Sequence, residues 1–201
     1  MLRNLLTTIR RSYRLLFKRQ EDARTREVVE TLRRVPLFHG LSRAALFDVA
    51  VAMHNRAFKR DEYLYYERDP GLGMYIVQRG RIRLTIEDGE GNVHELRQVE
   101  ESEFFGFLSV FGDFRRLESA QAMTESRVLG FFRPDLKTLI KRNPRTGAFI
   151  MAALSRNMAA WQIEMVRHVS EQQDRVYAVR LLHGAARAVR GYDPDLPAVE
   201  P

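Results

Sequence analysis

One stretch of the sequence, Phe104 to Ala122, has residue types suited to holding an anion. Gly106 follows two phenylalanines, and Arg116 stands ten positions later. A glycine at the start of a turn lets backbone N–H groups approach an anion, because no side chain blocks them. An arginine supplies a planar fork of donors that fits a phosphate group. The pattern therefore indicates binding of a phosphate or a similar anion.

The elements that must position these residues are predicted to be strands. The stretch itself reads as a strand, a short helical turn and a second strand. Over residues 81–86, apolar and polar side chains alternate with a period of two, which is typical of a half-buried strand. Asp-Gly and Gly-Asn pairs within 88–92 mark a hairpin turn. Short strands with turn signals from Arg56 to Phe132 predict a sandwich or a roll.

Helices are predicted after the strands. Pro134 to Arg142 reads as a short helix that Pro144 ends, and a long helix follows from Thr146. This long helix carries a heptad-like apolar stripe formed by Ile150, Leu154, Met158, Trp161, Met165 and His168. The stripe could lie on the roll as core, or it could pair two subunits. We favour a homodimer, because about six turns are too long for one small roll to cover.

Helices are also predicted before the strands. Residues 1–34 read as one helix, and Ser42 is a plausible N-cap for a second over Ala44–His54. The first 34 residues carry ten Lys/Arg against four Asp/Glu, whereas the rest of the chain is nearly balanced. A basic amphipathic helix of this kind could lie on an anionic membrane surface, or its apolar face could pack on protein. It is too short and interrupted to span a bilayer.

Several segments, in order, resemble the cyclic-nucleotide-binding domain family. Val35–Ser42 looks like that family's entry helix and turn, Glu67–Gly80 like its central strand pair, and Phe104–Ala122 like its phosphate-binding cassette. The resemblance covers roughly Arg33 to Ala160. It implies an α+β fold: an antiparallel β-roll, or cyclic-nucleotide-binding jelly roll, flanked by N-terminal helices and a long C-terminal dimer-type helix.

The resemblance also implies a binding site. Arg116 would hold the cyclic phosphate of cyclic AMP or cyclic GMP, and the Gly106 backbone would lie against it. The remaining cassette positions are Phe107, Leu108, Ser109 and Leu117, and the base-side candidates on the long helix are Trp161 and Gln162.

The cassette departs from the family at three positions. The family's glutamate, which takes the ribose hydroxyl, is Phe107 here, and phenylalanine cannot accept a hydrogen bond. Leu117 and Glu118 replace small residues after the arginine, and Glu118 adds a negative charge. These departures argue against ordinary cyclic AMP or cyclic GMP binding. A simpler interpretation of Arg116 is a surface charge paired with Glu118 or Asp113.

The domain organisation predicted from these patterns has four parts. They are a basic helical extension over 1–32, the roll domain over 33–145, a long helix with a linker-like helix over 146–191, and a tail over 192–201. Asp174–Leu182 looks like the linker helix of Crp/Fnr-type transcription regulators. No room for a winged helix-turn-helix follows it in this sequence, so we do not expect direct DNA binding.

The sequence contains no recognisable catalytic or metal-binding motif. Cysteine is absent, which is consistent with a cytoplasmic protein, and the five histidines form no zinc-type pair. No nucleophile-elbow serine or Walker-type loop is present. We therefore expect a non-enzymatic regulatory sensor that signals through its C-terminal helix. The alternatives are a ligand-free adaptor docked through its N-terminal helix on a protein or a membrane, and a transcription-regulator relative acting with a DNA-binding partner.

Overall fold

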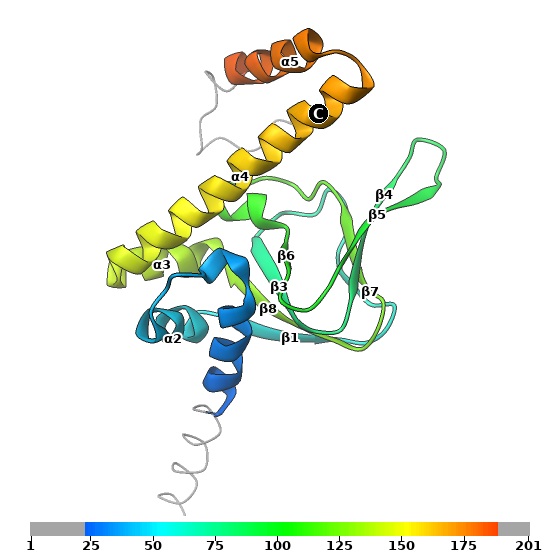
Figure 1. Ribbon diagram of the computed structural model, residues 1–201. Coiled ribbons are helices and arrows are strands. Elements are labelled where there is room, and N and C mark those ends of the chain that lie inside the picture. Colours follow the sequence, from blue (N-terminus) through cyan, green and yellow to red (C-terminus); the bar gives the residue numbers. More distant parts are fainter. Residues whose placement is uncertain (1–22, 189–201) are drawn as a thin grey trace, which may run out of the picture.

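A computed structural model describes residues 23–188 (Figure 1). Within these residues, eight strands form two four-stranded antiparallel sheets in the orders β1-β8-β3-β6 and β2-β7-β4-β5. The strands are β1 (His54–Phe58), β2 (Tyr63–Tyr65), β3 (Gly73–Arg79), β4 (Ile82–Glu87), β5 (Val93–Val99), β6 (Phe104–Phe105), β7 (Ser119–Ala122) and β8 (Ser126–Phe132). The predicted antiparallel β-roll is confirmed.

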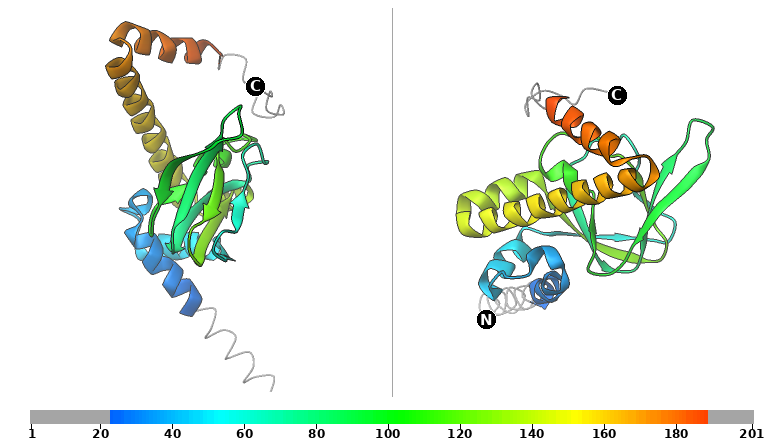
Figure 2. Two further views of the ribbon diagram at one scale, coloured as in Figure 1. Left: turned by 90° about the vertical axis from the view of Figure 1, so that its right-hand side faces the viewer. Right: turned by 45° about the horizontal axis from the view of Figure 1, so that its top comes forward.

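Helices lie at one side and one end of the roll (Figures 1 and 2). They are a helix over 23–34, α2 (Arg43–Val51), α3 (Arg133–Arg142), α4 (Pro144–Gln172) and α5 (Arg175–Ala188), with two 3₁₀ turns, η1 (Pro36–Phe38) and η2 (Phe107–Val110). Ser42 caps α2 as predicted, because its hydroxyl accepts from the Ala45 amide at 3.2 Å. Pro144 separates α3 from α4 as predicted, but α4 begins at Pro144 itself, where proline's missing N–H has no helical partner to lose.

Two apolar layers hold the roll together, one on each side of the β1-β8-β3-β6 sheet. Because side chains alternate along a strand, Ile76 and Leu129 face the helices while their neighbours Val77 and Val128 face the second sheet. The helix-side layer includes Leu32 and other apolar residues of the helix over 23–34. The β1-β8-β3-β6 sheet is therefore buried on both faces, which sets the register of β6, the strand that leads into the cassette.

The predicted stripe on α4 divides into two parts. Ile150 and Leu154 are fully buried in the helix-side layer, and Met158 packs against that layer. Trp161 and Met165 are 49% and 60% exposed, because α4 continues beyond the edge of the roll (Figure 2, left). The first half of the stripe is thus core, and the second half is open to a further contact.

One sequence interpretation changes with the structure, and another lies outside the described residues. Glu67–Gly80 contains one strand, β3, and not a strand pair; residues 67–72 form a bend joined to the cassette by an isolated bridge from Pro70 to Arg115. The apolar residues between Leu2 and Phe17, on which the amphipathic helix was predicted, lie outside the described residues. No helix within the described residues is long and apolar enough to cross a membrane.

Candidate functional site: the cassette pocket

The cassette begins where β6 ends. Phe105 pairs with Tyr75 of β3, and Gly106 then takes a left-handed conformation, with φ 67° and ψ 20°, before the η2 turn starts. This conformation strongly favours glycine. A Cβ atom at Gly106 would also collide with the Arg116 guanidinium. Gly106 is therefore required both by the turn and by the close approach of the arginine, as the ten-residue spacing suggested.

Arg116 is buried, with only 4% of its surface exposed. Its Nη1 donates to the Gly106 carbonyl at 2.9 Å, and its guanidinium carbon lies 4.1 Å from the centre of the Tyr65 ring. Its Nε is buried and has no hydrogen-bond partner in the described part of the chain. The interpretation of Arg116 as a surface charge is wrong, because the bend at Arg68 and Asp69 hydrogen-bonds its backbone on both sides and holds the residue inward.

The two acids proposed as partners of Arg116 have other partners. Asp113 forms an ion pair with Arg133. Glu118 accepts a hydrogen bond from the Tyr65 hydroxyl at 2.9 Å. Burial, and secondarily the charge of Glu118, raise the pKa of Tyr65 well above its usual range, so this phenol remains a donor at neutral pH. Tyr65 thus joins the arginine and the glutamate in one polar cluster.

A pocket of about 410 Å³ opens beside this cluster. Its lining residues come from β4, β5, the cassette and α4: Leu84, Leu96, Arg97, Phe105, Gly106, Phe107, Leu108, Ser109, Arg115, Arg116, Leu117, Glu118 and Trp161. Every predicted cassette residue lies in this lining, and so does Trp161. Gln162 does not, because it is the next residue along α4 and is exposed to solvent.

The cassette and α4 meet through two aromatic rings. Phe107 is 1% exposed and packs edge-to-face on Trp161, with ring centroids 4.7 Å apart and an interplanar angle of 73°. Phe104 and Phe111 make similar contacts with Phe107 from the other sides. Phe107 therefore belongs to the core and forms one wall of the pocket, and it offers a ligand no hydrogen bond.

The sequence interpretation missed the part of the site that other strands supply. Tyr65 lies under Arg116, and Leu84, Leu96 and Arg97 approach from the β4–β5 hairpin. Arg97 itself donates to the Phe104 carbonyl at 3.2 Å, which ties the hairpin to the cassette. Aromatic residues in a strand are usually core, so Tyr65 gave no separate signal.

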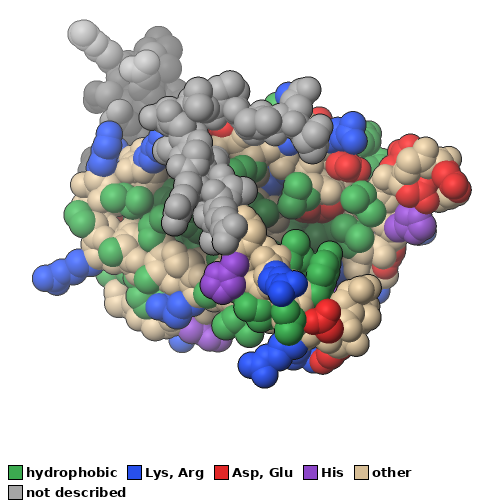
Figure 3. All heavy atoms as spheres, turned by 90° about the horizontal axis from the view of Figure 1, so that it is seen from above, with side chains coloured by type: hydrophobic (Ala, Val, Ile, Leu, Met, Phe, Trp, Pro, Cys, Tyr) green, Lys and Arg blue, Asp and Glu red, His purple; other side chains and the backbone are tan. Residues whose placement is uncertain are grey.

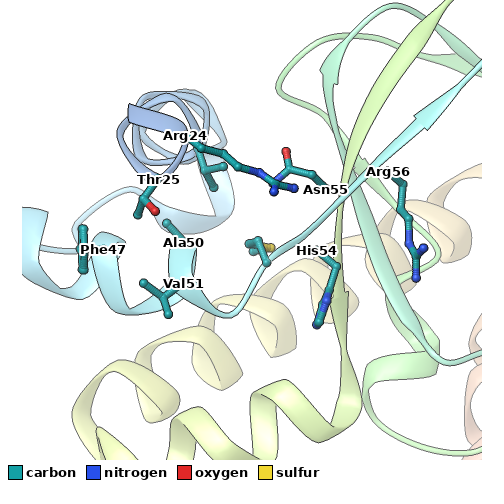
Figure 4. Close-up of a pocket in the computed structure, with 10 residues that line it drawn as sticks. Arg24, Thr25, Phe47, Ala50, Val51, His54, Asn55 and Arg56 are labelled. Atoms are coloured by element: carbon teal, nitrogen blue, oxygen red, sulfur yellow. The ribbon is translucent and has the colours of Figure 1, made fainter. Parts of the chain in front are cut away.

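A second hollow, of about 600 Å³, lies between the helix over 23–34, α2 and β1 (Figure 4). Arg24 points toward Asn55, and Phe47 and Val51 of α2 line the opposite side (Figure 4). None of the predicted site residues lines it. Although this hollow is larger, the cassette pocket is the better candidate, because it holds a buried arginine whose hydrogen-bonding capacity is not used up.

Metal ligands do not gather anywhere in the described residues, where no group of three or more His, Asp or Glu side chains could hold an ion. The described histidines include two with single carboxylate partners: His54 with Asp135 at 3.1 Å, and His94 with Asp88 at 2.7 Å. These exposed pairs are not metal sites.

Comparison with known proteins agrees with this geometry. The model of the family described as "Cyclic nucleotide-binding domain" matches residues 55–143. The cyclic AMP receptor protein of Thermus thermophilus is 30% identical over 131 residues, which are 65% of this chain and 60% of the relative. The chain thus spans about three fifths of that relative's length.

Solved structures share the fold. The N-terminal domain of a transcriptional regulator from Streptomyces coelicolor A3(2) matches with a TM-score of 0.62 and 28% identity, over 67% of this chain and 94% of that domain. A cyclic nucleotide-binding domain from Methylobacillus flagellatus KT matches with a TM-score of 0.64 and 20% identity, over 76% of this chain and 85% of the other. Residues 55–143 therefore match the cyclic nucleotide-binding domain family, and the solved structures agree with this match in their fold.

Proposed function

We propose that this chain is a non-enzymatic regulatory sensor that binds an anionic ligand in the cassette pocket and signals through α4. The family supports the sensor part, since the matched relatives are a cyclic AMP receptor protein and a transcriptional regulator domain. One observation carries the rest: the same pocket is lined by the cassette and by Trp161 of α4. A ligand there contacts both parts of the molecule.

Signalling requires that the ligand prefer one position of α4 over another. The part of α4 before Met158 is anchored in the core, while Trp161 is half exposed and is held beside the cassette through Phe107. A ligand that separates or tightens these two rings shifts the exposed part of α4. The core anchor leaves the roll itself unchanged.

Cyclic AMP and cyclic GMP are the first ligands to test, because the family binds them. The test uses Trp161, the single tryptophan of the chain, as its reporter. We expect a true ligand to change Trp161 fluorescence and to raise the unfolding midpoint. At a hundred times its dissociation constant, a ligand stabilises the fold by about 2.7 kcal/mol.

Two variants make this test specific. Arg116→Ala removes the buried cation and should abolish both responses. Arg127→Ala, an exposed arginine on β8 outside the pocket, should abolish neither. The sensor proposal would be overturned if cyclic AMP, cyclic GMP and the carboxylate 4-phenylbutyrate all left Trp161 emission unchanged.

We also propose a homodimer formed through the exposed half of α4. Hydrophobic side chains lie open on the face of the molecule that Figure 3 shows. On α4, Trp161 and Met165 of the predicted stripe are exposed. Met165, one turn beyond Trp161 on the same face, is 60% exposed, and neighbouring exposed hydrophobic residues often mark an interface. In analytical ultracentrifugation, Met165→Glu should convert a dimer to a monomer. The matched change Val51→Glu, at a 63% exposed position on α2, should not.

A ligand-free adaptor is the second candidate. It is favoured by the internal partners of Arg116, since the Gly106 carbonyl and the Tyr65 ring already satisfy part of its charge. In this version a cytoplasmic protein docks on a partner or an anionic membrane through residues 1–20. Co-sedimentation with anionic vesicles tests the membrane arm. Equal pelleting of the full chain and of a chain beginning at Glu21 would eliminate it.

A further inference from the structure

The cassette pocket is apolar over most of its wall. Seven of its lining residues are aliphatic or aromatic: Leu84, Leu96, Phe105, Phe107, Leu108, Leu117 and Trp161. They come from β4, β5, the cassette and α4, so a ligand in the middle of the pocket meets apolar surface from several directions. A ligand whose body is polar would lose hydrogen bonds to water without replacing them.

Acceptors for a ligand's hydroxyl groups are few. Among the described residues of the lining, only Ser109 and Glu118 have a side-chain acceptor. Glu118 already accepts from Tyr65, and the Ser109 hydroxyl is packed tightly against Gly71. A ribose hydroxyl at Phe107 finds no partner, and burying a hydroxyl without a hydrogen bond is unfavourable. The lining therefore disfavours a sugar.

The lining of the pocket carries more positive than negative charge. Arg97, Arg115 and Arg116 line it together with a single acid, Glu118. Arg97 and Arg115 also make contacts elsewhere, with the Phe104 and Arg68 carbonyls. Arg116 is the buried member, and its Nε is the polar atom left without a partner. One anionic group with two oxygens matches a guanidinium edge of this kind.

We propose that the ligand of this pocket is a monocarboxylate with an aromatic or aliphatic body, and not a cyclic nucleotide. Its carboxylate binds Arg116, and its body packs against Phe107, Leu108 and Trp161. A carboxylate is favoured over a phosphate monoester, because a doubly charged group would lie beside Glu118 with one incompletely bonded cation to offset it. A cyclic phosphodiester carries a single charge, so the ribose, and not the charge, is what disfavours a cyclic nucleotide here. This inference rests on the proposed function, in that it assigns the ligand of the same pocket.

The experiment uses the full chain and measures binding by isothermal titration calorimetry. The probes are 4-phenylbutyrate, its neutral amide and cyclic AMP. We expect the acid to bind at least about tenfold more tightly than the amide, because hydrogen bonds to charged groups are the stronger ones. We expect cyclic AMP to bind more weakly than the acid.

Variants at an exposed position avoid doubts about folding. Leu117 lines the pocket and is 64% exposed, so changing it leaves the core intact. Leu117→Lys should tighten the acid several-fold, Leu117→Asp should weaken it several-fold, and neither should affect the amide. Arg116→Gln should weaken the acid by about tenfold to a hundredfold. Arg127→Gln is the control, because it removes the same charge at an exposed position outside the pocket.

The outcomes separate this inference from the sensor proposal. Tighter binding of cyclic AMP than of the acid, with a change in Trp161 fluorescence, overturns the carboxylate and keeps the sensor. Acid binding without any Trp161 response keeps the carboxylate and overturns signalling through α4. Equal binding of acid and amide, or the same effect from both Leu117 variants, overturns the inference. Absence of acid binding at millimolar concentration does so as well.

Discussion

The Arg116 guanidinium lies over the Tyr65 ring, with its central carbon 4.1 Å from the ring centroid, while the Tyr65 hydroxyl donates to Glu118. The arginine is thus held by a ring face and one backbone carbonyl, and no carboxylate within residues 23–188 forms an ion pair with it. This arrangement keeps a cation buried and oriented beside the pocket. It also means that the arginine contributes less to stability than a fully paired buried ion would.

The first prediction concerns the cost of keeping this arginine. Arg116→Met retains a long side chain and removes a buried charge whose Nε has no partner. Replacing buried charges by apolar groups of similar volume is often neutral or stabilising. We expect urea denaturation to give a free energy of unfolding within about 1 kcal/mol of the unmodified protein, with ligand binding lost.

The matched control is Arg127→Met, an exposed change on β8 that should shift the free energy of unfolding by less than about 0.5 kcal/mol. A loss of more than about 3 kcal/mol in Arg116→Met would mean that the arginine is needed for folding. Its burial would then be no sign of a ligand.

The second prediction concerns the turn before η2. Gly106→Ala places a Cβ in a left-handed conformation, at φ 67°, and against Arg116 Nη1. The conformation alone costs about 1–2 kcal/mol, and the arginine must move. We expect thermal unfolding at a lower temperature and weaker ligand binding together.

Gly89→Ala is the comparison for that change. A Cβ at Gly89, in the β4–β5 turn, meets nothing within 4 Å. Alanine at a compatible glycine position leaves stability unchanged or raises it by up to about 1 kcal/mol. If the two variants behaved alike, the left-handed turn at Gly106 would not be what positions Arg116.

Much of the fold could be predicted from the sequence, because its signals are local. The alternation over 81–86 became β4, Ser42 became a cap, and Pro144 separated two helices. Each of these depends on a period or a backbone restriction that neighbouring residues decide. The glycine-to-arginine spacing of the cassette is local in the same sense, and in the structure Arg116 donates to the Gly106 carbonyl. That both residues hold a ligand stays a prediction.

The rest of the site depends on strand pairing over long distances in the chain. Tyr65 is about fifty residues from Arg116, and they meet because β2 pairs with β7. No local pattern encodes that register. The burial of Arg116 was missed for a related reason. A charged residue among other charges is usually exposed, and only the bend at Arg68 and Asp69 turns this one inward.

A third prediction concerns acid pH and the tip of the β4–β5 hairpin, where acidic side chains gather (Figure 3). Asp88 accepts from His94 at 2.7 Å and from the backbone amides of Glu90 and Asn92, each at 2.9 Å. The hydrogen bond from His94, followed by those from Asn92, lowers the pKa of Asp88 well below its usual range. The ionised form is therefore the one that the folded turn favours.

The pH dependence of the turn's stability follows from this lowered pKa of Asp88. The turn is fully stabilised above the unfolded pKa of aspartate, about 3.9, and the stabilisation is lost as pH falls further toward the folded pKa. By NMR, amide protection in 88–92 should be constant from about pH 7 to 5 and should fall only in stronger acid. His94→Ala should move the Asp88 titration upward, whereas His39→Ala, at an exposed position before α2, should leave it in place. Loss of protection already near pH 6 would contradict this account.

The fourth prediction tests whether α4 is coupled to the cassette. Phe107 and Trp161 form an edge-to-face pair, and such pairs are worth about 0.5–1.5 kcal/mol beyond the area that they bury. A double-mutant cycle with Phe107→Leu and Trp161→Leu should return a coupling energy in that range, measured by urea denaturation. A bound ligand that repositions α4 should change this coupling energy.

The control cycle pairs Phe107→Leu with Ile163→Leu, two residues further along α4 and largely exposed. Its two effects should add within about 0.5 kcal/mol, because residues without shared contacts behave independently. A coupling energy near zero for Phe107 and Trp161 would mean that the rings touch without holding each other. In that case α4 would not sense the cassette through them, and a ligand in the pocket would have to act on the helix by direct contact with Trp161.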